Sequence, residues 1–139
     1  MLALHALPKL TLYDCWNGEA PADATTPHFR VADGGGSDLA FVYCEVPPGG
    51  EVGTHQDSAE EMVVVLEGAL QGWVGDERRD AREGDLLVIP AMAPHGFRNA
   101  SGARARFLGV FAASRVVSTF EKPLAPWGQR VLETPTPSQ

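Results

Sequence analysis

Glycine and proline recur so closely along this chain that they limit how long any regular element can be. The 139 residues include 15 glycines and 11 prolines. No window of about a dozen residues shows the 3.6-residue apolar period of an amphipathic helix. Any helix is therefore expected to be confined to short turns near the termini.

Between these breakers lie short stretches with the composition of β-strands. Turn-forming segments occur at 34–36, 47–50, 75–77 and 101–102. Strands are expected at 29–32, 39–46, 60–66, 70–74, 85–89, 95–98, 104–113 and 116–120. Many short strands at regular spacing predict an all-β chain folded as an antiparallel sandwich or barrel.

The length of the chain fits a single domain. Within it we expect an N-terminal arm with the first strands at 1–36, a barrel core at 37–120, and an extended proline-rich tail at 121–139 whose last residues are disordered. The run 62–66 is apolar at every position, so both faces of that strand are expected to be covered. This run and the exposed strand edges predict a homodimer, with the N-terminal strands and the tail as exchange arms.

The charge balance excludes several classes of partner. A net charge of −7 argues against nucleic acid, which needs a basic surface, and against an anionic membrane surface. No apolar run reaches the roughly 20 residues that span a bilayer, and the N-terminus lacks the pattern of a signal peptide.

Cys15 and Cys44 follow no metal or redox spacing. They are expected to be free thiols of a cytoplasmic protein.

Two segments, 49–68 and 84–99, concentrate the residues that carry chemistry. His55 and Asp57 are two apart on a strand, so their side chains share one face. Glu61 has the same parity and follows a short polar turn, and His95 comes from a separate hairpin. Two hairpins facing each other across a small barrel bring all four side chains to one point. Two neutral imidazoles and two carboxylates balance the charge of one divalent metal ion.

These segments resemble the paired motifs of the cupin superfamily, G-x5-H-x-H-x3,4-E-x6-G and G-x5-P-x-G-x2-H-x3-N. The chain is similar to the small single-domain members. The resemblance implies an antiparallel double-stranded β-helix, or jelly-roll barrel, with metal ligation by His55, Glu61 and His95. The matching positions are Gly49, His55, Glu61, Gly68, Gly84, Pro90, His95 and Asn99.

Two positions depart from the family pattern. Asp57 stands where a second histidine is usual, and it can either ligate the metal or accept a hydrogen bond from a histidine. Met92 replaces a turn glycine, which places a thioether near the pocket mouth. The mixed nitrogen and oxygen donors fit Fe, Mn, Ni or Zn and do not choose among them.

Other residues are weaker candidates for binding. Phe97 shares the strand parity of His95 and is the best pocket candidate, followed by Met92, Tyr43 and Trp73, although such residues are more often plain core. Arg104 and Arg106 alternate with apolar neighbours, which fits either a solvated face or the binding of an acidic substrate.

Two functions remain open at this point. The first is a metal-dependent enzyme of dioxygenase or isomerase type that acts on a small organic molecule, with its catalytic residues unassigned. The alternative is a non-catalytic module that binds a small ligand. A purely structural barrel would leave the four metal-ligand candidates unexplained.

Overall fold

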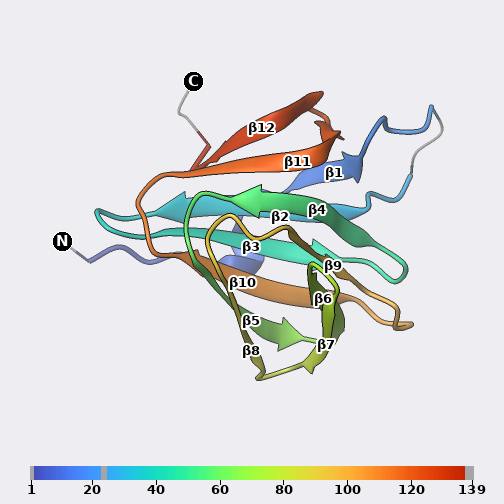
Figure 1. The fold of residues 1–139 in the computed structure, drawn as a ribbon, viewed down its shortest axis with the longest axis horizontal. Coiled ribbons are helices and arrows are strands. Elements are labelled where there is room, and N and C mark those ends of the chain that lie inside the picture. Colours follow the sequence, from blue (N-terminus) through green and yellow to red (C-terminus); the bar gives the residue numbers. More distant parts are fainter. Residues whose placement is uncertain (1, 23–24, 137–139) are drawn as a thin grey trace.

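The computed structural model describes residues 2–22 and 25–136, and their fold is all-β, as predicted. One 3-10 turn, Leu7–Lys9, precedes the strands of the barrel (Figure 1). The strands are β1 (Tyr13–Asn17), β2 (Phe29–Gly35), β3 (Ala40–Val46), β4 (Glu51–Asp57), β5 (Glu61–Glu67), β6 (Ala69–Val74), β7 (Glu77–Arg82), β8 (Leu86–Ile89), β9 (His95–Arg98), β10 (Ala105–Phe111), β11 (Val116–Ala125) and β12 (Gln129–Thr134).

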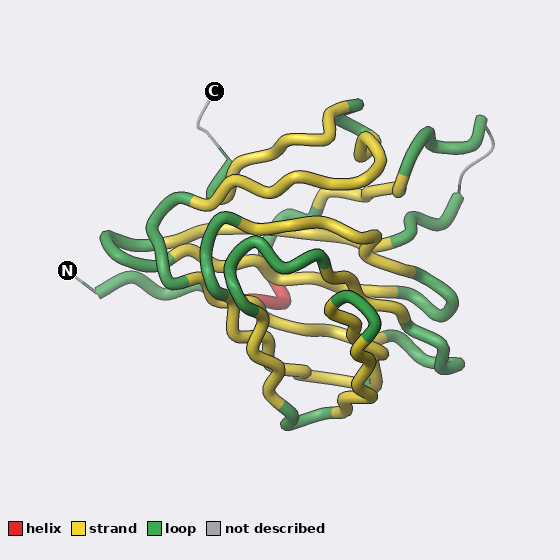
Figure 2. The backbone as a smooth tube through the Cα atoms, in the orientation of Figure 1, coloured by secondary structure: helices red, strands yellow, loops and turns green. Residues whose placement is uncertain are grey.

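The strands form the double-stranded β-helix that the cupin resemblance implies. Eleven strands follow one another in the order β7-β6-β9-β4-β11-β1-β2-β3-β10-β5-β8, and β12 pairs with β11 beside this path. Neighbouring strands pair antiparallel. Figure 2 shows that strands make up most of the described chain. Strand β1 connects the two halves of the barrel, because it pairs with β2 on one side and β11 on the other. Within the described ranges, no helix is long and apolar enough to cross a membrane.

The core lies between the two halves, where alternate side chains of each strand point inward. On β5, Val63 and Val65 are buried, and Phe107 on β10 packs in the same cluster. The outward residue Met62 is 46% exposed, so this chain covers only one face of the apolar run 62–66. Leu86 and Val88 on the adjacent edge strand β8 are exposed beside it.

The C-terminal region is more regular than the extended tail expected from its prolines. Residues 121–125 are the second half of β11, and β12 folds back on β11 as an antiparallel hairpin, drawn in red at the top of Figure 1. Thr136 fastens the end of this hairpin to β2, because its backbone N–H and its hydroxyl both donate to Asp33 Oδ2. The expected disorder concerns residues 137–139, which lie outside the described residues.

Two other segments also differ from the sequence-based expectation. Strand β7 lies where the expected strand list left a gap, and all its side chains except that of Ala81 are exposed. Strand β4 begins directly after the Pro-Pro-Gly-Gly segment; the expected strand list did not give its bounds, although His55 and Asp57 were placed on a strand there.

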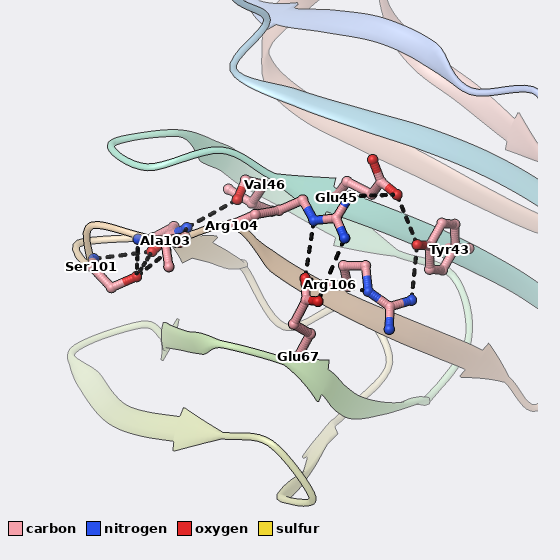
Figure 3. Close-up of polar contacts among 9 residues, drawn as sticks. Tyr43, Glu45, Val46, Glu67, Ser101, Ala103, Arg104 and Arg106 are labelled. Atoms are coloured by element: carbon pink, nitrogen blue, oxygen red, sulfur yellow. Dashed lines mark hydrogen bonds and ion pairs between the residues drawn. The ribbon is translucent and has the colours of Figure 1, made fainter. Parts of the chain in front are cut away.

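Asn99 joins the ends of the two cupin-like segments and is fully buried. Its side-chain amide donates to the carbonyls of Val46 (2.9 Å) and Ala103 (2.8 Å), and its Oδ1 accepts from Ser101. These three partners are labelled in Figure 3. Its backbone carbonyl also accepts a hydrogen bond from the N–H of Gly49 (2.8 Å). The asparagine of the second motif therefore has a structural role, since it holds two loops together.

We expect Asn99→Ala to lower the free energy of unfolding by about 1–3 kcal/mol, because it leaves buried carbonyls without a donor. Urea unfolding followed by circular dichroism measures this change. The control is Gln71→Ala, which removes an exposed amide from β6 and should change stability by less than about 0.5 kcal/mol. Equal stability of the two variants would show that the Asn99 bonds are not needed.

Candidate metal centre

Strand pairing brings the four predicted ligand residues to the interior of the barrel. His55 and Asp57 lie on β4, which pairs with β9 on one side and β11 on the other. His55 is directly opposite His95, the first residue of β9. Glu61, the first residue of β5, reaches the same place from the other half of the barrel. All four side chains are buried.

His55, Asp57 and His95 form a group that can hold a metal ion, with one donor atom from each lying within 4.8 Å of the others. The nitrogen His95 Nε2 is 3.2 Å from Asp57 Oδ2 and 3.5 Å from Glu61 Oε1. His55 Nε2 is 3.6 Å from the same Asp57 oxygen. Glu61 contacts this group of three residues at His95 Nε2.

The backbone sets the orientation of both imidazole rings. Nδ1 of His55 lies 2.8 Å from the carbonyl of Gly53, and Nδ1 of His95 lies 2.8 Å from the carbonyl of Ala93. In each case Nδ1–H donates to the carbonyl, so a neutral ring presents the Nε2 lone pair to the centre. Phe120 stacks on His55 with ring centroids 4.5 Å apart and fixes the ring from the β11 side.

Three buried atoms at the centre have no hydrogen-bond partner among the described residues: Asp57 Oδ2, Glu61 Oε1 and His95 Nε2. The other oxygen of Asp57, Oδ1, accepts a hydrogen bond from the hydroxyl of Ser118 on β11. Leaving buried polar atoms unpaired is costly, and native proteins rarely do so without a reason. A divalent cation bound here satisfies all three, so the residues present fit a metal ion.

The pKa values of the two histidines are shifted in opposite directions. Burial lowers the pKa of His55 to about 4, so this ring is neutral. Burial also acts to lower the pKa of His95, but the Asp57 and Glu61 carboxylates 3.2 and 3.5 Å from its Nε2 outweigh burial and raise the pKa to about 10. The proton on His95 therefore offsets the negative charge of the two carboxylates, which a bound metal cation would otherwise neutralise.

Gly109 on β10 makes room for the Glu61 carboxylate. A Cβ atom at this position would overlap Glu61 Oε2, so any larger residue would displace the carboxylate. Sequence reasoning identified neither Gly109 nor Ser118, because both lie outside the two motif segments. Their roles follow from the antiparallel pairing of β10 with β5 and of β11 with β4, which the sequence pattern does not reveal.

A cavity of about 400 Å³ opens from the centre and runs beneath the C-terminal hairpin. His55, Asp57 and Glu61 form its inner end, together with Phe97, the best pocket candidate from the sequence. Cys44 also lines it, and burial raises the pKa of this thiol well above its ordinary value. The remaining lining is mainly aromatic and aliphatic.

The other three pocket candidates lie elsewhere. The hydroxyl of Tyr43 donates to Glu45 (2.9 Å), and its side chain belongs to the polar group in Figure 3. Trp73 packs over Gly96 and donates its indole N–H to Thr54 Oγ1 (3.2 Å). Met92 is 55% exposed and occupies a turn with φ of 64°, the left-handed region for which glycine is suited.

The two arginines considered for substrate binding do not reach the cavity. Arg104 pairs with Glu67 at 3.0 Å, and Arg106 donates to the hydroxyl of Tyr43 at 3.1 Å (Figure 3). The solvated-face alternative for these residues therefore fits their surroundings.

A family model described as the Cupin domain matches residues 42–111, half of the chain. Among solved structures that share the fold is a sugar phosphate isomerase from a cupin superfamily of Silicibacter pomeroyi, at 19% identity and a TM-score of 0.68, with 99% of this chain and 97% of that chain covered. An oxalate decarboxylase mutant of Bacillus subtilis matches at 15% identity and a TM-score of 0.65, with 70% of this chain and 29% of that chain covered. A polyketide cyclase of Streptomyces resistomycificus matches at 22% identity and a TM-score of 0.62, with 80% of this chain and 79% of that chain covered. This chain spans less than a third of the decarboxylase chain. No curated protein matches the sequence.

We expect Ser118→Ala to weaken divalent metal binding about 10- to 100-fold, because Asp57 loses the hydroxyl that orients it. Competition titration with a chelating indicator measures the dissociation constant. Thr119→Ala is the matched control on the same strand, since Thr119 is not part of the cavity lining and should leave affinity unchanged. Equal affinities for the two variants would contradict an orienting role for Ser118.

Proposed function

This chain belongs to the cupin domain family, and from that premise we propose that it binds one divalent transition metal and transforms a small organic molecule in the adjoining cavity. The observation that carries the proposal is the set of three unpaired buried atoms, Asp57 Oδ2, Glu61 Oε1 and His95 Nε2. Asp57 and Glu61 line a cavity large enough for a small ligand, and His95 Nε2 lies 3.2 Å from Asp57 Oδ2.

The proposed ligands are His55, Asp57 and His95, with Glu61 completing the set. Two carboxylates and two neutral imidazoles neutralise a divalent cation, and Fe, Mn, Ni and Zn all accept such donors. When bound, the metal supplies a Lewis acid that polarises a carbonyl or hydroxyl oxygen of the substrate, or with iron supports dioxygen chemistry. Both dioxygenase-type and isomerase-type reactions fit this description.

The surrounding residues prepare the site for such chemistry. The backbone carbonyls of Gly53 and Ala93 fix the tautomers of the two histidines, and Ser118 fixes Asp57. Phe120 stacks on the imidazole of His55, and Phe97 packs edge-on against that of His95. Burial raises the pKa of Glu61, whereas the pKa of Asp57 is lowered, so of the two carboxyl groups Glu61 holds a proton more readily.

We expect His55→Ala and His95→Ala each to abolish stoichiometric metal binding while the barrel stays folded. Elemental analysis of untagged protein, after loading with Fe, Mn, Ni or Zn, should give close to one metal per wild-type chain. Glu61→Gln tests the fourth ligand and should lower metal retention, whereas Glu60→Gln, an exposed neighbour, should not. Wild-type metal content in both histidine variants would refute the ligand assignment.

Absence of metal from the wild-type protein after every loading attempt would favour the alternative, a non-catalytic module that holds a small ligand. A metal-replete protein that binds but never converts its ligands would indicate the same function with a metal. The homodimer and the cytoplasmic location stay predictions, and light scattering measures the oligomeric state directly.

Metal affinity should fall about tenfold for each unit that the pH drops from 8 to 6, because one proton must leave His95 before Nε2 can bind. The sign follows from its pKa of about 10: the ring is protonated throughout this range. His55, with a pKa of about 4, adds no further dependence. Calorimetry in buffers of different ionisation enthalpy should show about one proton released per metal. Binding without proton release would contradict a protonated His95.

A further inference from the structure

We propose that the cavity takes an uncharged aromatic molecule of one or two rings. This inference rests on the proposed function, because it names the substrate class of the same centre. It follows from the chemistry of the cavity wall, from the positions of the cationic side chains, and from a pair of aromatic residues at the mouth.

Aromatic and aliphatic side chains together make up most of the cavity wall. Five phenylalanines line it, and all are buried: Phe29, Phe97, Phe107, Phe111 and Phe120. The rings of Phe97 and Phe107 lie 4.9 Å apart at 42°, a tilted arrangement favourable for aromatic contact. Flat rings gain most from such walls, since edge and face contacts add to the burial of apolar area. A cavity of about 400 Å³ lies in the lower part of the range for small-ligand pockets, which suits one or two rings.

No lysine or arginine of the described chain lines this cavity. Arg104 and Arg106 are engaged with Glu67 and Tyr43 at the polar group of Figure 3. The acidic residues near the mouth, Asp33 and Glu133, are also engaged, with Thr136 and Arg115. A carboxylate or phosphate in the cavity would have no side-chain cation beyond the metal centre. That centre already holds the two carboxylates that balance a divalent ion. Burying such an unpaired anion is costly, so anionic substrates are disfavoured.

Two aromatic residues mark the mouth. Tyr13 on β1 and Trp127 in the turn between β11 and β12 have ring centroids 5.4 Å apart, and both line the cavity. Trp127 is partly exposed and Tyr13 is exposed, so this pair lies where the cavity meets solvent. Neither residue falls within the segment that the family model matches. The specificity of this opening is therefore a property of the N- and C-terminal strands of this chain.

The test compares 2-naphthol with 2-naphthoate, which have the same ring system but differ in charge. Dissociation constants are measured for the zinc-loaded full chain by tryptophan fluorescence and calorimetry. We expect 2-naphthol to bind about tenfold or more tightly than 2-naphthoate. Equal or tighter binding of the naphthoate, or no binding of either compound, would overturn the proposal.

Two tryptophan variants locate the binding. Trp127→Ala should weaken 2-naphthol about tenfold through lost stacking and lost apolar contact. Trp16→Ala, the control, removes an indole that bonds to the Thr26 carbonyl away from the cavity and should leave affinity within about twofold. Equal losses in both would overturn the assignment of the mouth. Thermal melting confirms that each variant is folded.

The same samples separate this inference from the proposed function, because their metal content is measured independently. A protein that holds metal but prefers the naphthoate retains the metal function and refutes the aromatic class. A protein that prefers 2-naphthol but does not retain metal supports the aromatic class and refutes the metal function.

Discussion

The registration of β4 between β9 and β11 is the constraint on which the rest of the site depends. It sets His55 opposite His95 on one side and opposite Phe120 on the other. A slip of one residue would turn His55 and Asp57 to the outer face, because side chains alternate along a strand. The buried charge, the unpaired atoms and the cavity all depend on this one alignment. Both neighbours of β4 contribute to it, since His55 stacks on Phe120 of β11 and its ring lies 4.2 Å from that of His95 on β9.

Much of the fold follows from local patterns in the sequence. Short β-rich stretches between glycine and proline predict an all-β barrel, and the structure confirms it. The alternation that places His55 and Asp57 on one face also holds, and both are buried at the same centre. These features are predictable because they depend on spacing within a strand or across a single turn.

Features that depend on pairing between distant strands could not be predicted in this way. Gly109 and Ser118 matter only because β10 and β11 lie beside the motif strands, and no pattern in their own neighbourhoods reveals this. Tyr43 is an aromatic residue of the kind that often lines pockets, but it faces the opposite side of β3 from Cys44. Its hydroxyl accepts a hydrogen bond from Arg106 instead. Prolines in the C-terminal region suggested an extended tail, yet the antiparallel pairing of β11 with β12 overrides this local signal.

The C-terminal hairpin, attached to β2 by the bonds between Thr136 and Asp33, supplies a different part of the site from the motif strands. Strands within residues 42–111 supply His55, Asp57, Glu61 and His95, while Trp127 and much of the outer wall come from the hairpin. Changes in the hairpin can alter which molecules enter without disturbing most of the groups that hold charge at the centre. A barrel built this way can diversify its choice of ligand by exchanging one terminal segment while its inner chemistry is inherited.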